Sequence, residues 1–320
     1  MDPRHLEYFV SIAEHGSVRA AALALGVSQS AVSQGLHALE HELSSDLFNR
    51  TATGMVPTPA ARAIIGPARR LRRRMMQLSS AVSDSSRSQG LVEFSVTPSM
   101  AFGALARAVA RFKRLNPGVT FNIAEVPSEA DGVGHVANGS YEIFLAHLAG
   151  DVVAQIDRIS DLETVHLGWH ETWVAYPPET RLDRDCEAMR WEDLPDLPMI
   201  VVQRGGVRVQ VIEDMVRSIG RPTMPSLVLE HREARLAYVM RGLGGCFIEG
   251  PLIEEARRRG AVIARLEPPL RTPLGLVYSR STVSPIAREF IATCVRVFDE
   301  SDEESGGGTD RSSTDDQMLG

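Results

Sequence analysis

The stretch GSVRAAALALGVSQSAVSQGLHALEHEL, residues 16–43, decides the fold of the N-terminal part of the chain. It predicts two short helices joined by a tight turn. Ser17 is a suitable N-cap for a helix over residues 18–25, and Gly26 is a residue type that ends helices. Ser28 then caps a second helix, which extends to about Leu43.

The second helix of this pair is polar at its start and apolar further along. Its inward face carries apolar residues at helical spacing, whereas Gln29, Ser30, Ser33 and Gln34 are expected to face solvent. Short amide and hydroxyl side chains at the start of an exposed helix can pair with base edges in the DNA major groove. The pattern therefore predicts a DNA recognition helix. An ordinary helical hairpin with a polar face is the alternative that this segment alone leaves open.

The flanking segments complete a three-helix unit with a wing. Leu6, Phe9 and Val10 lie on one face of an amphipathic helix that precedes the pair. After the pair, LFNRTATGMVPTP at residues 47–59 predicts a two-stranded wing. Arg50, at the base of this wing, is well placed for a phosphate or minor-groove contact.

With the wing included, the chain resembles the LysR-type transcriptional regulators. Their N-terminal pattern appears here as FVSIAEHGSVRAAALALGVSQSAVSQGLHALEHELSSDLFNR, residues 9–50, followed by VPTPAARAI, residues 56–64. The family usually has glycine where Ser44 and Ala61 stand. The resemblance covers the chain to about residue 298 and implies DNA-binding, linker and effector-binding parts. The residues expected to contact double-stranded DNA are Ser17, Arg19, Ser28, Gln29, Ser30, Ser33, Gln34 and Arg50.

Composition indicates a globular cytoplasmic protein of two or three domains. The 320-residue chain has no apolar run that would span a membrane and no signal-like N-terminus, so no membrane partner is expected. Its three widely spaced cysteines include no CxxC and fit a reducing compartment. The formal charge of −7 is that of residues 299–320 alone, which predict a disordered acidic tail, while residues 1–90 carry +3.

A heptad pattern follows the wing and predicts a linker helix that pairs with a second copy, over residues 61–90 with a polar hinge at the end. Gly66 and Pro67 interrupt it with either a bend or a new helix start. Five arginines between residues 69 and 74 are interpreted as a solvated face, or as additional phosphate contacts. A homodimer or homotetramer is expected. The seam residues are Ile64, Ala68, Leu71, Met75, Leu78 and Val82.

Residues 91–298 alternate between strand and helix patterns and predict an α/β domain of two lobes. The first lobe, residues 91–162 and 269–298, reads as a βαβαβ unit with a parallel sheet. The second, residues 163–268, reads as a second such set. Two strands are expected to cross between the lobes, as in the periplasmic binding-protein-like fold. The whole chain is thus predicted as multidomain: a mainly α winged helix-turn-helix at residues 1–60, a long linker helix, and a two-lobed regulatory domain.

No motif indicates a catalyst, a metal or a cofactor. His37, Glu40 and His41 fit the H-x-x-E-H pattern of some zinc proteases, but they lie in the back half of the recognition helix without a nearby third ligand. Cys246 is interpreted as a buried inert thiol, with a redox sensor as the alternative. An effector-independent regulator of the same fold remains open, and an enzyme or a solute-binding protein on the α/β lobes is disfavoured.

The effector site is predicted from topology, because ligands of open α/β sheets bind at the carboxyl ends of the strands. Hydroxyls and free amides after the first strand suit a small anion, such as a carboxylate-bearing metabolite with an apolar body. RNA polymerase is a further candidate partner. The expected effector contacts are Thr97, Ser99, Met100, His147, Gln203, Arg204, Cys246 and Phe247.

Overall fold

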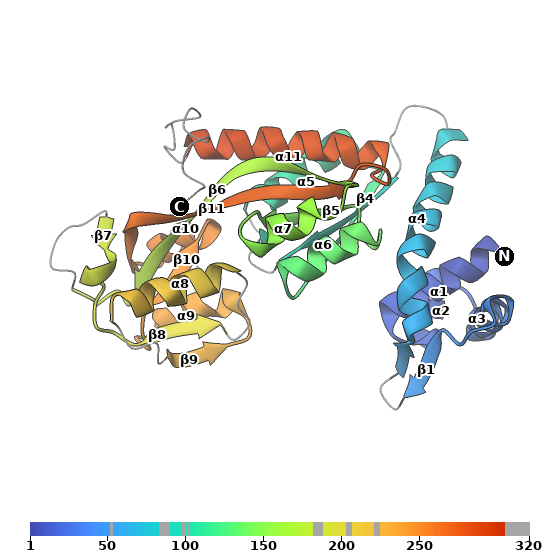
Figure 1. The fold of residues 1–320 in the computed structure, drawn as a ribbon, viewed down its shortest axis with the longest axis horizontal. Helices are drawn as coiled ribbons and strands as arrows, with labels where there is room; N and C mark the ends of the chain where they lie inside the picture. Colours follow the sequence, from blue (N-terminus) through green and yellow to red (C-terminus); the bar gives the residue numbers. More distant parts are fainter. Residues whose placement is uncertain are drawn as a thin grey trace.

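The computed structural model describes residues 1–51, 54–82, 90–97, 100–101, 103–181, 188–202, 207–220 and 225–304. Three parts follow one another along the longest axis of the molecule (Figure 1). The N-terminal unit and helix α4 lie at one end, a first α/β lobe lies in the middle, and a second lobe lies at the other end. No helix within these ranges is long and apolar enough to cross a membrane.

The N-terminal unit has the three helices and the wing that the sequence predicts. The elements are α1 (Pro3–His15), α2 (Val18–Leu25), α3 (Gln29–Leu43) and the antiparallel pair β1 (Phe48–Thr51) and β2 (Gly54–Pro57). The Ser17 hydroxyl accepts from the Ala20 amide at 3.1 Å, and the Ser28 hydroxyl accepts from the Ala31 amide at 3.2 Å. Both predicted N-caps are confirmed.

The two departures from the family pattern occupy tight positions. Ser44 ends α3 in the left-handed region with φ 50°, where glycine is free of the Cβ penalty that serine carries. Ala61 is fully buried in the core of the N-terminal unit, in the first turn of α4.

Helix α4 (Pro59–Val82) is a single helix with Pro67 inside it. Gly66 and Pro67 both weaken a helix, and the packing of α4 on the first lobe accounts for the glycine. A Cβ atom on Gly66 would lie 1.9 Å from the carbonyl oxygen of Asn138 in the first lobe. Glycine therefore permits a backbone-to-backbone approach between α4 and the regulatory domain.

The first lobe confirms the βαβαβ prediction. Strands β4 (Val119–Glu125), β3 (Gly90–Val96) and β5 (Ile143–His147) are parallel neighbours, connected through α5 (Ala104–Leu115) and α6 (Glu129–Ala137). A short helix, α7 (Asp151–Asp157), follows and was not predicted.

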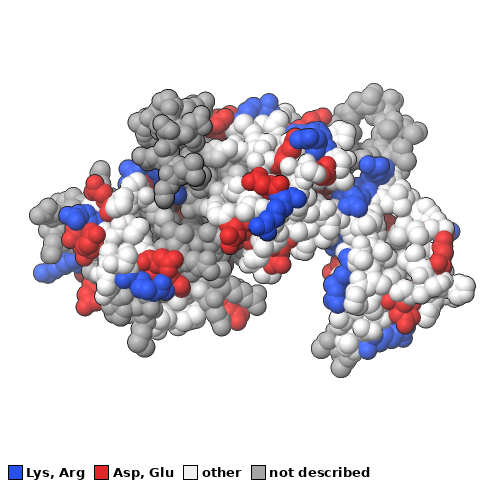
Figure 2. Space-filling view, in the orientation of Figure 1, with Lys and Arg blue, Asp and Glu red and all other residues white. Residues whose placement is uncertain are grey.

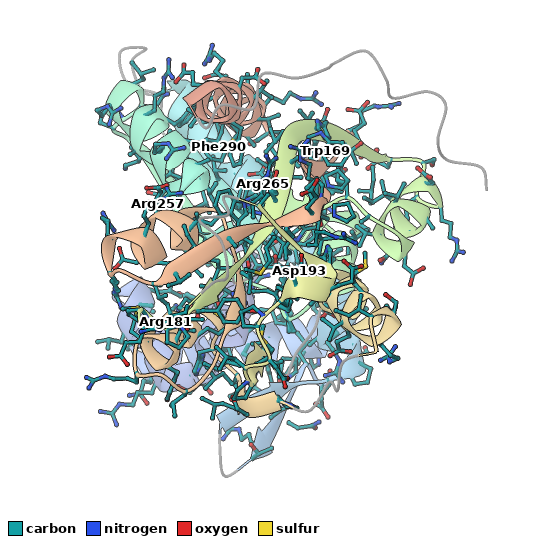
Figure 3. All side chains as sticks on the ribbon, turned by 90° about the vertical axis from the view of Figure 1, so that its left-hand side faces the viewer. Trp169, Arg181, Asp193, Arg257, Arg265 and Phe290 are labelled. Atoms are coloured by element: carbon teal, nitrogen blue, oxygen red, sulfur yellow. The ribbon has the colours of Figure 1, made fainter. Side chains whose placement is uncertain are left out.

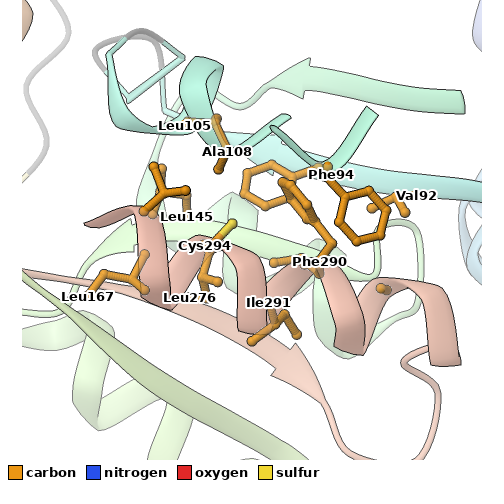
Figure 4. Packing of buried hydrophobic residues seen from close by; sticks show 14 of the residues in the cluster. Val92, Phe94, Leu105, Ala108, Leu145, Leu167, Leu276, Phe290, Ile291 and Cys294 are labelled. Carbon is orange, nitrogen blue, oxygen red and sulfur yellow. The ribbon is translucent and has the colours of Figure 1, made fainter. Parts of the chain in front are cut away.

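Helix α11 (Pro285–Glu304) packs on this sheet together with α5 and closes the main core. Phe290 lies edge-on to Phe94 there (Figure 4). It also lies edge-on to Phe112 and Phe121. The helix continues six residues into the segment that was expected to be a disordered tail from residue 299; residues 305–320 lie outside the described ranges.

Two long antiparallel strands connect the lobes, as predicted. They are β6 (Leu162–Tyr176) and β11 (Val262–Ser279), and Figure 3 labels Trp169 on the first and Arg265 on the second. The sheet order is β10-β6-β11-β5-β3-β4. The sequence pattern predicts strands only over residues 172–176 and 274–279, so both strands are much longer than predicted. Both predicted lobe boundaries fall within them. Their ladder is interrupted between Arg265 and Leu270, where β11 pairs with β7 (Ala188–Arg190) instead.

The second lobe departs from the expected parallel set because its strands divide between two sheets. Strands β8 (Met199–Val202) and β9 (Pro225–Leu229) form a separate parallel pair, whereas β10 (Cys246–Glu249) runs antiparallel to β6. The described residues of this lobe also form two 3₁₀ turns and three helices. These elements are η2 (Trp191–Asp193), α8 (Val207–Ser218), η3 (Arg232–Ala234), α9 (Arg235–Val239) and α10 (Pro251–Arg258).

Candidate DNA-binding and effector sites

The starts of α2 and α3 and the wing surround one shallow groove. Its walls include Ser17, Gln29, Ser30, Ser33 and Arg50. The Ser28 and Ser30 hydroxyls lie 2.9 Å apart at the start of α3. The structure therefore brings five of the eight predicted DNA contacts to one groove. Arg19, Ser28 and Gln34 are exposed but do not line it.

The wing is fixed to the helix pair by main-chain contacts. The Met55 amide donates to the Gly16 carbonyl at 2.8 Å. Gly54 has a φ of 129°, and a Cβ atom there would lie 2.5 Å from the same carbonyl oxygen. Arg50, which pairs with Met55 across the wing, is thereby held next to the start of α3.

The H-x-x-E-H residues His37, Glu40 and His41 lie on α3, where Glu40 stabilises the local fold. His37 is exposed, with its Nδ1 3.6 Å from a Glu40 carboxylate oxygen. The other Glu40 oxygen accepts from the Leu47 amide at 2.9 Å and so holds the turn before the wing. Among the residues that the structure describes, no group of three or more His, Cys, Asp or Glu could hold a metal ion.

Three of the five arginines between residues 69 and 74 bind carboxylates of the same chain, which corrects their interpretation as a solvated face; Arg74 is exposed, as that interpretation expects. Arg72 donates to both oxygens of Glu14 at 3.1 Å and to Glu93 at 2.8 Å. Arg73 also donates to Glu93, and it donates to the Gly139 carbonyl at 2.9 Å. Arg73 is 4% exposed and Glu93 is fully buried, so this ion pair is shielded from solvent.

Two further arginines extend this contact between α4 and the first lobe. Arg70 donates to the Asn138 carbonyl at 2.6 Å. Arg69 pairs with Glu14 at 3.3 Å and lies over the ring of Tyr141. Although burial lowers the pKa of the Arg72 guanidinium, the carboxylates of Glu14 and Glu93 raise that pKa overall. On the face drawn in Figure 2, basic and acidic side chains alternate over the molecule.

The predicted dimerisation seam divides into two parts. Ala68 is buried in the core of the N-terminal unit, and Ile64 packs against that core. Leu71 and Met75 are 43% and 38% exposed, which is unusual for large apolar side chains. Leu78 and Val82 belong to α4, but their side chains lie outside the described part of the structure.

Thr97 and His147 lie at the carboxyl ends of neighbouring strands, as the topology predicted. Thr97 is 6% exposed, and its hydroxyl has no hydrogen-bond partner among the described residues. Met100, by contrast, is 2% exposed and packs in the main core. Burial of its side chain removes it from a ligand-accessible position.

His147 belongs to a cluster that the sequence did not reveal. Its Nε2 lies 3.3 Å from Nδ1 of His170 on β6, and its Nδ1 lies 3.7 Å from a Glu129 oxygen at the start of α6. Glu129 and His147 are both buried. A Cβ atom on Gly250 would lie 3.6 Å from Nε2 of His170, so β10 ends beside this cluster. The cluster therefore lies where the two lobes meet.

The predicted contacts from the second lobe lie in its two cores. Cys246 is fully buried, and burial raises its thiol pKa to about 12, which fits an inert thiol. Phe247, on the other side of β10, stacks on Trp191 with the ring centroids 5.8 Å apart. Ser99, Gln203 and Arg204 lie outside the described residues.

Sequence reasoning missed Glu129, His170 and the buried Thr172, whose hydroxyl also has no partner in the described part of the chain. His170 and Thr172 lie on β6, where the sequence predicted no site residue. A signal did exist for Glu129, because it begins a helix that follows a parallel strand, which is where such sheets bind ligands.

Comparisons with known proteins agree with this architecture. Residues 3–62 match the model of the bacterial regulatory helix-turn-helix protein, lysR family, and residues 85–299 match the LysR substrate binding domain. The regulator TfdS of Cupriavidus pinatubonensis is 26% identical over 315 residues, which cover 91% of this chain and 97% of that protein. The regulator DgcR of a Pseudoalteromonas species is 32% identical over 124 residues, 38% of this chain and 43% of that protein.

Two solved structures share the fold over nearly the whole chain. Full-length CbnR in complex with its target DNA has a TM-score of 0.63 at 20% identity and covers 93% of this chain and 100% of that one. A full-length OxyR variant from Pseudomonas aeruginosa has a TM-score of 0.64 at 18% identity, covering 92% and 98%. The substrate-binding model alone spans about two thirds of the sequence. The chain therefore belongs to the LysR family of DNA-binding transcription regulators.

Proposed function

We propose that this regulator reads its operator with Gln29, Ser33 and Gln34 of α3 and anchors the DNA backbone with Arg50. The observation that carries the proposal is the groove that combines the start of α3 with the wing. Amides and hydroxyls there are available to base edges, and the arginine beside them supplies the charge that phosphates require. Ser17, Arg19, Ser28 and Ser30 complete the surface that faces DNA.

A salt-dependent gel shift with the DNA upstream of the protein's own gene tests this proposal. Arg50→Ala is expected to weaken binding to operator and random DNA alike and to reduce the salt slope by about 1, because one phosphate contact is lost. Arg114→Ala, on α5 and outside the groove, is the matched control and leaves the slope unchanged. An unchanged slope for Arg50→Ala would contradict the assigned role.

We further propose that Leu71 and Met75 lie in a dimer contact formed by α4, continued by Leu78 and Val82. Their exposure on a helix with a heptad pattern supports this, because exposed large apolar residues at that spacing favour a helix partner. Leu71→Asp combined with Met75→Asp would place like charges opposite each other in a symmetric pair. Light scattering is expected to detect monomers. An unchanged oligomer would contradict the α4 contact.

We propose that the effector binds where the lobes meet, near Thr97 and the cluster of Glu129, His147 and His170. The buried Thr97 hydroxyl has no partner among the described residues, which supports a ligand there, because such a group is costly unless something binds it. Ser99, Gln203 and Arg204 stay proposed contacts, and a small anionic metabolite stays the proposed class. Binding would shift the population of lobe arrangements and thereby reposition α4.

The remaining assignments are that the protein has no catalytic activity, acts in the cytoplasm and contacts RNA polymerase when bound to DNA. The named regulators among its relatives support a non-enzymatic role. A regulator without an effector is the second candidate. A library of small anions screened by thermal shift separates the two, because only an effector-binding protein is stabilised by a specific member.

A further inference from the structure

A second cavity lies between α4 and the first lobe, away from the predicted effector site. It is lined by Arg70, Arg73 and Arg74 on one side, and by Glu142 and residues 281–285 at the start of α11 on the other. Its volume is about 490 Å³, which is enough for a small ion and ordered water. A ligand in this cavity would contact the linker helix and the regulatory domain together.

The positive charge at this cavity is only partly compensated. Arg73 pairs with Glu93 and lies 3.9 Å from a Glu142 oxygen, but Arg70 donates to a neutral carbonyl, and Arg74 forms no ion pair with any carboxylate in the described part of the chain. Burial, together with the charges of Arg73 and Arg74, lowers the pKa of Arg70. An anion between Arg70 and Arg74 would relieve this repulsion.

The Glu142 carboxylate is a second, independent feature of the cavity that indicates a ligand. Its side chain is 1% exposed; one carboxylate oxygen accepts from the Ser284 amide at 2.9 Å, and the other is buried without a hydrogen-bond partner. Burial raises the pKa of this carboxyl. Of the nearby hydroxyls, Ser281 donates to Asp161 and Thr282 donates to Ser279. The hydroxyl and the amide of Ser284 both bond to the Glu142 carboxyl and act against the effect of burial on its pKa. The free oxygen therefore needs a donor that the described residues do not supply.

We propose that this cavity binds orthophosphate, with Arg70 and Arg74 holding its charged oxygens and Glu142 accepting its P–O–H group. Orthophosphate keeps at least one O–H in both ionic forms present at neutral pH, whereas sulfate and phosphodiesters have none. A buried acceptor carboxylate therefore repels sulfate and a DNA phosphate while it binds orthophosphate, because only the latter supplies the missing donor. The site is independent of the proposed effector position and of the DNA-binding groove.

Equilibrium dialysis of the full-length protein against labelled orthophosphate tests this site. We expect one phosphate per chain, which about a tenfold excess of sulfate or dimethyl phosphate does not displace. Arg74→Ala is expected to weaken binding about tenfold or more, because a charge-assisted hydrogen bond is lost. Arg74 is exposed, so this variant should fold normally. Arg114→Ala controls for net charge, and Arg50→Ala shows that the bound phosphate is not in the DNA-binding groove.

Glu142→Gln tests the selectivity separately, since an amide can donate to sulfate. We expect sulfate to compete with phosphate for this variant. Displacement by sulfate from the unaltered protein, unchanged binding to Arg74→Ala, or loss of binding only in Arg50→Ala would overturn the proposal.

Discussion

The DNA-binding groove and the junction between α4 and the first lobe use the same kind of side chain in opposite ways. Arg50 is exposed beside the groove, with its charge available to a partner outside the chain. Arg73 is buried at the junction, with its charge neutralised by Glu93. An exposed arginine contributes to binding and little to folding, whereas a buried ion pair makes each partner dependent on the other. The sequence alone places both arginines in one basic N-terminal region.

The strongest test of this contrast removes the buried carboxylate. Glu93→Ala leaves Arg73 buried without its partner and is expected to lower the free energy of unfolding by about 3–5 kcal/mol. Denaturant unfolding measures this change in the free energy of unfolding. Glu254→Gln, which breaks an exposed pair with Arg257, is the control and should have a much smaller effect. Equal losses of stability in the two variants would contradict the expectation that the buried ion pair contributes more to folding than the exposed one. Glu93→Gln, which keeps the side-chain shape, serves if the alanine variant fails to fold.

The corresponding test at the groove changes binding and leaves folding intact. Gln29→Ala is expected to cost about 1–3 kcal/mol at the operator, with non-specific DNA affinity and thermal stability unchanged. Competition gel shifts with operator and random DNA measure the difference. His41→Ala, exposed near the end of the same helix, controls for a general effect on α3. If Gln29→Ala weakens both DNAs equally, Gln29 does not read bases.

A glycine at the junction gives a test whose sign is informative. In a free helix, Gly66→Ala would stabilise by about 1 kcal/mol through helix propensity. In the docked arrangement, its Cβ would lie 1.9 Å from the Asn138 carbonyl, so we expect a net loss of about 1–3 kcal/mol. Thermal unfolding decides the sign. A stabilised variant would indicate that α4 does not dock on the first lobe in solution.

The smallest expected effect concerns a buried polar group that, unlike Glu93, has no partner in the described part of the chain. Thr97→Val removes the unpaired hydroxyl with little change of shape and is expected to stabilise the ligand-free protein by about 1 kcal/mol. The same variant should lose its thermal response to the effector. Stabilisation with an intact response would place the effector elsewhere.

Local signals made the N-terminal unit predictable to the residue. The bounds of α2 and α3 follow from Ser17, Gly26 and Ser28, whose conformational preferences act within a few residues of the chain. The three parallel strands of the first lobe and the helices α5 and α6 between them were likewise predicted, whereas α7 was not predicted and α11 continues beyond its predicted end at residue 298. One face of each of these predicted elements is buried, so apolar residues recur in the sequence at the spacing of a helix or a strand.

Contacts between distant segments were not predictable in the same way. Arg73 on α4 pairs with Glu93 on β3 and with Glu142, which directly precedes β5, and no spacing rule connects these residues. His147 and His170 meet because β5 and β6 both pair with β11. The length of β6 was underestimated because its first half alternates weakly between buried and exposed residues. Tertiary pairing, rather than local pattern, extends it.

The interruption of the β6–β11 ladder between Arg265 and Leu270 has a consequence for tryptophan fluorescence. Where β11 leaves β6, Trp191 donates its indole N–H to the Pro268 carbonyl at 3.0 Å and stacks on Phe247 of β10. Trp191 is 1% exposed, whereas Trp169 on β6 is 51% exposed. Bending at the interruption would alter the hydrogen bond and ring stacking of Trp191, while Trp169 stays hydrated. The third tryptophan, Trp173, is half-buried on β6 and pairs with Arg265 beside the interruption. The chain thus contains, at the connection between its lobes, a fluorophore whose emission depends on their arrangement.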